Sequence, residues 1–138
     1  MTLILRPASA DDAPATHGML SQLGYRACEE ALRARLDRIY HAPDAEAIVA
    51  TDGERLVGLV ALELAAPAGS PCRLAALVVR GSSRRRGVGR ILLAAAEAVA
   101  CARGCAALEA SCAQAAGRRF LRRSGFAGGP RAMVKRLD

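Results

Sequence analysis

Aromatic residues are scarce in this chain, whose 138 residues include no tryptophan, two tyrosines and two phenylalanines. Proteins that hold single-stranded nucleic acid stack bases on aromatic side chains, so this scarcity disfavours that class. A net charge of +7 and an isoelectric point near 9.9 keep nucleic-acid binding as an alternative. The basic residues concentrate at 84–90 and 118–123, however, which a small polyanionic ligand explains more simply.

Long hydrophobic runs are also missing, since none approaches the roughly 18 to 20 apolar residues that cross a bilayer. Residues 1–7 form a short apolar segment without the basic lead-in of a secretory signal. We therefore expect a cytoplasmic protein that makes no membrane contact. Hydrophobic residues make up 52% of the chain, and its length fits one globular domain over residues 1–138.

Cysteine is present without a recognisable pairing pattern. The count is five, which is odd, and no Cys-x-x-Cys pair occurs. These features disfavour both a disulfide framework and a zinc site. Cys101 and Cys105 lie one helical turn apart but have no histidine nearby. We expect Cys101 and Cys105 to serve as packing residues and the protein to hold no metal.

The most informative stretch is 77–93, which reads as an apolar strand, a polar loop and the start of a helix. The first N–H groups of a helix lack partners and carry partial positive charge, so they attract anions. Glycine at 87 and 89 lets a phosphate approach these groups. Arginines surround them at 84, 85, 86 and 90, where cations are unfavourable unless an anion binds. The stretch predicts a phosphate or pyrophosphate site, here called the phosphate loop (residues 84–90).

Two common phosphate motifs do not fit this loop. The dinucleotide fingerprint Gly-x-Gly-x-x-Gly lacks its third glycine here. A triphosphate-binding loop requires Gly-Lys-Ser/Thr, and the only lysine is Lys135. Arg-x-x-Gly-x-Gly, from Arg84 to Gly89, is the pattern that remains.

Hydrophobic periodicity and turn residues predict the other elements. We expect helices from the Ser9–Asp12 region to Gly24, and over 28–40, 88–102 and 114–123. Strands are expected over 3–7, 47–51, 56–64, 73–79, 106–111 and 132–137. The strand, helix and strand between 73 and 111 predict a right-handed crossover.

This order of elements resembles the GNAT superfamily of acetyl-coenzyme-A-dependent N-acyltransferases. The resemblance rests on residues 52–58, on 77–89 with its Arg-x-x-Gly-x-Gly motif, and on 120–126, which is similar to the family's Phe-Tyr-x-x-x-Gly-Phe. It implies an α/β (α+β) fold, with a mixed, mostly antiparallel twisted sheet flanked by about four helices. It also implies acetyl-coenzyme A as co-substrate, and a homodimer is compatible with it.

The resemblance further implies where the co-substrate binds. The backbone of Leu77 and Val79 would pair with the pantetheine arm. N–H groups from Arg85 through Arg90 would hold the pyrophosphate. The complete set of expected contacts is Leu77, Val78, Val79, Arg84, Arg85, Arg86, Gly87, Val88, Gly89, Arg90, Gln114, Phe120 and Arg122.

The implied chemistry is direct attack of a primary amine, from a small molecule or peptide, on the thioester. Glu63 and Glu109 are candidate bases acting through water, and the Val79 N–H is a candidate oxyanion donor. The family's proton-donating tyrosine falls at Leu121, which cannot donate. Cys112 or Ser111 are candidate replacements.

Other donors and a second function stay open. Tyr25 and Tyr40 on the acceptor side are alternative proton donors. Loss of the tyrosine also suggests a catalytically degenerate acyl-coenzyme-A-binding sensor. The expected acceptor walls are 24–28, 40–46 and 64–72, which do not identify the acceptor.

Overall fold

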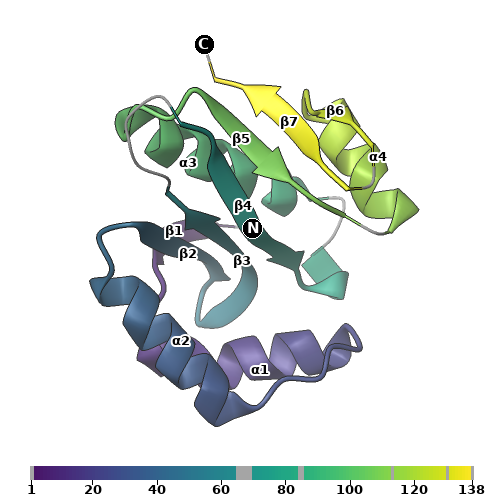
Figure 1. Cartoon of the computed structure of the whole chain (residues 1–138). Coiled ribbons are helices and arrows are strands. Elements are labelled where there is room, and N and C mark those ends of the chain that lie inside the picture. Colours follow the sequence, from purple (N-terminus) through teal and green to yellow (C-terminus); the bar gives the residue numbers. More distant parts are fainter. Residues whose placement is uncertain (1, 65–69, 84–85, 113, 130, 138) are drawn as a thin grey trace.

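The structure is a computed structural model that describes residues 2–64, 70–83, 86–112, 114–129 and 131–137. Within these residues, seven strands form one sheet in the order β1-β2-β3-β4-β5-β7-β6 (Figure 1). The strands are β1 (Leu3–Pro7), β2 (Ala45–Asp52), β3 (Arg55–Glu63), β4 (Cys72–Val79), β5 (Ala107–Ala110), β6 (Ala127–Gly128) and β7 (Met133–Arg136). The α-helices are α1 (Ala13–Gln22), α2 (Glu29–His41), α3 (Val88–Ala102) and α4 (Ala115–Arg123), and short 3-10 turns are η1 (Ala10–Asp12) and η2 (Gly81–Ser83).

The sheet is mostly antiparallel, as predicted. Only β4 and β5 pair in parallel among the described strands, and α3 connects them. Two adjacent parallel strands need such a crossover connection, because a tight turn between them would reverse the chain and make the strands antiparallel. The expected fold class, a mixed sheet flanked by four helices, is confirmed.

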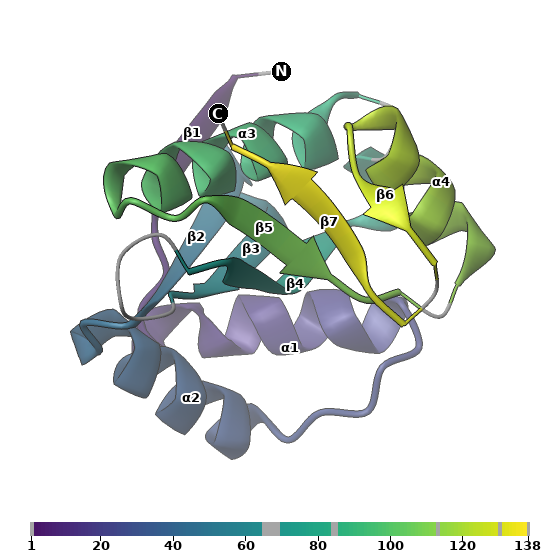
Figure 2. The same cartoon turned by 45° about the horizontal axis from the view of Figure 1, so that its top comes forward.

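The helices cover both faces of the sheet. Figures 1 and 2 show α1 and α2 on one face and α3 and α4 on the other. One hydrophobic core lies under α3 and α4, and a second lies under α1 and α2. Seven consecutive residues of β3, 56–62, are buried, as expected for a central strand covered on both faces.

Element boundaries lie close to those predicted from sequence. Gly24 and Gly104 follow α1 and α3 with φ of 86° and 78°, a left-handed conformation that favours glycine and ends a helix. The i,i+4 pair between Glu29 and Arg33 forms on α2 at 3.6 Å. The two-residue strand β6 was not predicted, because Gly128 and Gly129 indicate a turn.

An ion pair fixes the connection from β1 to α1. Arg6 donates to both carboxylate oxygens of Asp12 at 2.7 and 2.9 Å. The Ser9 N–H also donates to this carboxylate at 2.8 Å. These hydrogen bonds, chiefly those from Arg6, hold the pKa of Asp12 below its ordinary value.

The expectation that the cysteines form no disulfide is wrong, because Cys72 and Cys105 are disulfide-bonded. The two residues are 33 positions apart, so no local spacing indicates the pair. The parallel pairing of Cys72 with Leu108 brings the start of β4 beside the segment before β5. Cys28, Cys101 and Cys112 are free thiols.

The described part of the chain contains neither a cluster of metal-ligating side chains nor a membrane-spanning helix. No group of three or more His, Cys, Asp or Glu side chains is placed there to hold a metal ion. No helix within the same residues has the length and apolar character needed to cross a bilayer.

Candidate functional site

One edge of β4 lacks a strand partner along most of its length. On its β3 side, β4 is paired from Arg73 to Val79. On its β5 side, pairing is limited to Cys72 with Leu108 and Arg73 with Glu109. The edge of β4 over residues 74–79 is therefore open among the described strands. Unpaired backbone N–H and C=O groups on such an edge can pair with an extended ligand.

A β-bulge lies near the point where this open edge begins. Ala76 pairs with Ala61 and Leu74 pairs with Leu62, so Ala75 has no β3 partner of its own. Ala75 and Ala76 both pack against the core under α1 and α2 instead of alternating between faces. A bulge redirects side chains and backbone groups and is common beside functional sites.

The far end of β4 is anchored where it leads into the phosphate loop. Arg80 donates to the Leu56 carbonyl and to the Gln22 side chain, each at 2.9 Å. Burial of its guanidinium, the largest effect, and the nearby charge of Arg55 lower the pKa of Arg80. These contacts tie the start of the loop to β3 and α1.

The phosphate loop leads directly into α3, as predicted. Gly87 precedes the helix with φ of 81°, and no atom of the described residues, its chain neighbours aside, lies within 4 Å of where its Cβ would be. Arg86 and Arg90 are exposed beside it. The predicted contacts Arg84 and Arg85 lie outside the described residues. The backbone at the start of α3 is thus accessible over Gly87.

Gly89 lies where β4, α3 and α4 meet. A Cβ at this position would lie 3.4 Å from Phe120 Cζ and 3.6 Å from Val79 Cγ2. The absent side chain therefore allows the Phe120 ring to approach the first turn of α3. Three residues of the expected co-substrate set, Val79, Gly89 and Phe120, are brought together here.

Some of the other expected co-substrate contacts have side chains packed against the cores, whereas others have side chains exposed to solvent. Leu77 and Val79 pack against the core under α3 and α4, whereas Val78 packs against the opposite core. Val88 is 1% exposed, so it has little beyond its backbone to offer a ligand. Gln114 and Arg122 are exposed. The structure thus makes the backbone, more than the side chains, available to a ligand along this path.

The two candidate carboxylates flank Arg73 across three adjacent strands. Glu63 and Glu109 are its register partners on β3 and β5. Arg73 donates to Glu63 at 2.7 and 3.1 Å, and these hydrogen bonds hold the pKa of Glu63 below its ordinary value. Glu109 forms no ion pair within the described residues. Of the two candidate carboxylates, Glu109 is therefore the one without an ion-pair partner among the described residues.

Leu121, at the position of the family's tyrosine, and Cys112, one of its candidate replacements, both lie in or near α4. Leu121 is 5% exposed and belongs to the hydrophobic core. Cys112 is half-buried, with its sulfur 3.5 Å from the Gln114 carbonyl oxygen. A Cβ at Gly117 would collide with the Cys112 sulfur. Cys112 therefore packs against the start of α4.

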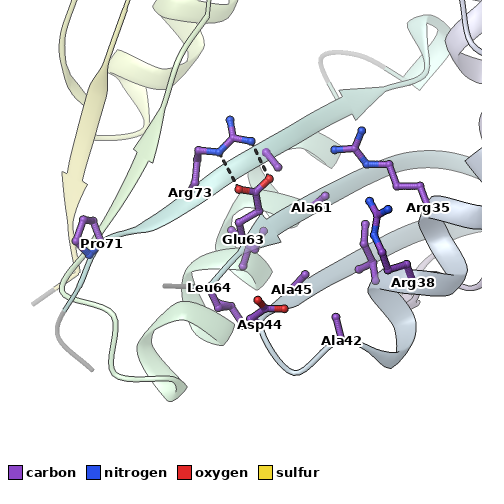
Figure 3. Close-up of a pocket in the computed structure, with 13 residues that line it drawn as sticks. Arg35, Arg38, Ala42, Asp44, Ala45, Ala61, Glu63, Leu64, Pro71 and Arg73 are labelled. Carbon is purple, nitrogen blue, oxygen red and sulfur yellow. Dashed lines mark hydrogen bonds and ion pairs between the residues drawn. The ribbon is translucent and has the colours of Figure 1, made fainter. Parts of the chain in front are cut away.

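A cavity of about 570 Å³ opens on the α2 side of the sheet (Figure 3). Its lining includes Ala42, Asp44 and Leu64 from two of the predicted acceptor walls, but no residue of 24–28. Arg35 and Arg38 also line it and were not predicted. The sequence signal for them is a pair of arginines three residues apart, beside the apolar stripe of α2.

The family model for the acetyltransferase (GNAT) family matches residues 14–126 of this chain. No curated protein is significantly similar to the chain in sequence. Solved structures nevertheless share its fold. A structure from Desulfovibrio desulfuricans assigned to the GNAT family of acetyltransferases has a TM-score of 0.85 and 20% identity, covering 99% of this chain and 100% of its own.

Two solved structures with coenzyme A bound share the fold as well. PaiA N-acetyltransferase from Thermoplasma acidophilum has a TM-score of 0.76 and 19% identity over 99% of both chains. N-acetylglutamate synthase from Neisseria gonorrhoeae, bound to coenzyme A and N-acetyl-glutamate, has a TM-score of 0.76 and 22% identity over 100% of this chain and 36% of its own. Because the family model spans most of the sequence, this chain belongs to the GNAT family of acetyltransferases.

Proposed function

We propose that this protein is an N-acetyltransferase that moves an acetyl group from acetyl-coenzyme A to a primary amine of a small molecule or peptide. Membership of the GNAT family makes acetyl-coenzyme A the co-substrate. We further propose that residues 1–138 act as a single acetyltransferase domain. The cytoplasmic location and the homodimer stay predictions.

The observation that carries this proposal is the open edge of β4, which leads to the phosphate loop. An extended pantetheine arm would pair with this edge as an added strand. The N–H groups at the start of α3 would hold its pyrophosphate. The space over Gly87 and the exposed Arg86 and Arg90 fit an anionic group there. Arg84 and Arg85 remain predicted contacts of the same loop.

We place the thioester near the bulge at Ala75, because the phosphates occupy the opposite end of the open edge. Backbone N–H groups at the bulge are then better placed than that of Val79 to stabilise the oxyanion. Val79, the donor suggested by sequence, adjoins the phosphate end. The bulge would turn these backbone N–H groups toward the reacting carbonyl.

We assign Glu109 as the carboxylate that takes the amine proton, through water. It belongs to the last β4–β5 pair, where the open edge begins. Its neighbours Leu108 and Ala110 are buried in the core under α3 and α4, so alternation places Glu109 on the face of α1 and α2. Glu63 then holds Arg73 in position.

The reaction forms a bond between the amine nitrogen and the acetyl carbon and breaks the carbon–sulfur bond. Acetyl-coenzyme A supplies the activated acetyl group. Leu121 offers no proton to the leaving sulfur, but an ordinary thiol has a pKa of about 8.5. Departure as a thiolate near neutral pH is therefore feasible without a tyrosine.

The proposal is tested by following thiol release from acetyl-coenzyme A with a panel of primary amines. We expect release that depends on both the protein and the amine, and acetylated amine detected by mass spectrometry. Release at the same rate without amine would contradict amine transfer. The same reaction without protein is the control for non-enzymatic acetylation.

A second function, a sensor that binds acyl-coenzyme A without turnover, is favoured by one observation. The buried Leu121 occupies the position of the family's proton donor. A sensor would bind acetyl-coenzyme A tightly and release no thiol with any amine. The thiol-release experiment therefore separates the two functions.

A further inference from the structure

We propose that the acceptor is a small primary amine that also carries a carboxylate, and that Arg35 and Arg38 hold this carboxylate. The inference rests on the proposed function, because it names the class of amine for the same reaction. Both arginines extend from α2 into the cavity of Figure 3, across from Glu63 and Arg73.

Two adjoining cavities under α2 provide the space for this acceptor. The outer cavity measures about 570 Å³ and the inner one about 220 Å³. Their linings share Arg35, Ile39, Ala61 and Ala75. Pockets for small ligands in proteins measure roughly 300 to 1,000 Å³, so the outer cavity alone can hold a metabolite-sized molecule.

The charges lining the outer cavity favour an anion. Its lining carries Arg35, Arg38 and Arg73 against Asp44 and Glu63. Arg73 and Glu63 pair with each other, and the nearby charge of Arg35 also helps to lower the pKa of Glu63. Arg35 and Arg38 are exposed and form no ion pair or side-chain hydrogen bond of their own within the described residues. Guanidinium groups bind carboxylates through paired hydrogen bonds. Two arginines one helical turn apart therefore provide a carboxylate site that no side chain of the described residues occupies.

The same cavity reaches the expected reacting end of the co-substrate. Ala75, the bulge residue, and Arg73, the last residue of β4 paired with β5, both line it. An amine at the bulge and a carboxylate at Arg35 thus fit within one cavity. This proximity requires a short molecule, because both groups must reach their partners at once.

The inner cavity indicates what else the acceptor carries. Its lining is mostly apolar, as shown by Met19, Leu20 and Val78. Thr16 also lines it and is 3% exposed, and its Oγ1 atom has no hydrogen-bond partner among the described residues. A buried hydroxyl without a partner is unfavourable. An aliphatic side chain of the acceptor would fill this space, and a polar group on that side chain would pair with Thr16.

The test compares leucine, methionine and threonine with their carboxamides as acceptors in the thiol-release assay. We expect kcat/KM to favour the carboxylate form at least about tenfold, as for hydrogen bonds to charged groups. Arg35→Gln and Arg38→Gln should each remove most of this preference by raising KM. The dissociation constant of acetyl-coenzyme A and kcat/KM for the carboxamides should stay unchanged. Arg33→Gln is the matched control, because Arg33 pairs with Glu29 on the same helix outside the cavity.

Three results would overturn the inference while leaving the proposed function in place. These are equal kcat/KM for amino acids and carboxamides, a preference for the polyamine spermidine, and an unchanged preference in both arginine variants. Acetyl-coenzyme A binding without acetylation of any carboxylated amine would also overturn it. Failure to bind acetyl-coenzyme A at all would instead remove the proposed function, and the inference with it.

Discussion

The ring of Phe120 lies against Gly89, so close that a Cβ on Gly89 would be 3.4 Å from the ring. This contact joins α4 to the first turn of α3, next to the proposed pyrophosphate site. We predict that Gly89→Asp abolishes acetyl-coenzyme A binding, because a carboxylate would face both the ring and the phosphates. Calorimetric titration of the folded variant measures this effect.

Gly89→Ala is the matched control for this prediction. Its methyl group would lie at an ordinary van der Waals distance from Phe120 and Val79, so we expect the variant to fold and to keep measurable binding. Circular dichroism checks that both variants are folded. Unchanged affinity in a folded Gly89→Asp protein would contradict the pyrophosphate assignment.

Gly58 allows α3 to pack closely on β3, and its substitution should be destabilising. A Cβ there would lie 2.7 Å from Leu92 Cδ1 and 3.1 Å from the Val78 carbonyl oxygen. We predict that Gly58→Ala lowers the free energy of unfolding by about 1–3 kcal/mol, as overpacking does. Urea denaturation of the variant and the wild type measures the difference.

Gly18 provides the opposite case within α1. Apart from its chain neighbours and the nearby backbone of α1, no atom of the described residues lies within 4 Å of its Cβ position. Gly18→Ala should therefore raise the free energy of unfolding by about 0.5–1 kcal/mol through helix propensity. If Gly58→Ala and Gly18→Ala changed the free energy of unfolding equally, the prediction that close packing at Gly58 makes Gly58→Ala destabilising would be wrong.

The ion pair between Arg6 and Asp12 should make stability depend on pH. The pKa of Asp12 is lowered in the folded protein, so its contribution is present above the unfolded-state pKa of about 3.9. The contribution is lost as the pH falls through the folded-state pKa. We predict that Asp12→Asn lowers the free energy of unfolding at pH 7 by about 1–3 kcal/mol.

At pH 3 the difference between Asp12→Asn and the wild type should be smaller than at pH 7. Urea denaturation at the two pH values measures both differences. A difference that is the same at both would show that the charge of Asp12 contributes nothing to stability.

Glu109 should contribute to turnover more than Glu63 does. We predict that Glu109→Gln lowers kcat about 100-fold, a typical effect for a general base, without changing acetyl-coenzyme A affinity. Glu63→Gln should have a smaller effect, because Glu63 acts by holding Arg73. Glu54→Gln, in the exposed turn between β2 and β3, is the control. If Glu63→Gln lowered kcat more than Glu109→Gln did, Glu63 and not Glu109 would be the base.

Local sequence patterns were sufficient to predict the main elements. Apolar residues at helical spacing and the glycines at 24 and 104 located α1 and α3. The Arg-x-x-Gly-x-Gly pattern located the phosphate loop before α3, because helix starts and glycine loops are local features.

Features that depend on strand register or tertiary contacts could not be predicted in this way. The disulfide joins Cys72 and Cys105 across α3, and the pair between Arg73 and Glu63 requires the β3–β4 register. The bulge at Ala75 follows from that same register. Arg35 and Arg38 are exposed arginines of α2, and only the packing of α2 beside the sheet brings them to the lining of the cavity.

The most direct test of the central claim is amide hydrogen exchange with and without acetyl-coenzyme A. The claim is that the open edge of β4 and the start of α3 hold the co-substrate. We predict slower exchange over residues 74–79 and 86–91 when acetyl-coenzyme A is bound, with little change in β1 and β2. The claim would be contradicted if saturating acetyl-coenzyme A slowed amide exchange in neither segment, or slowed it only in other strands.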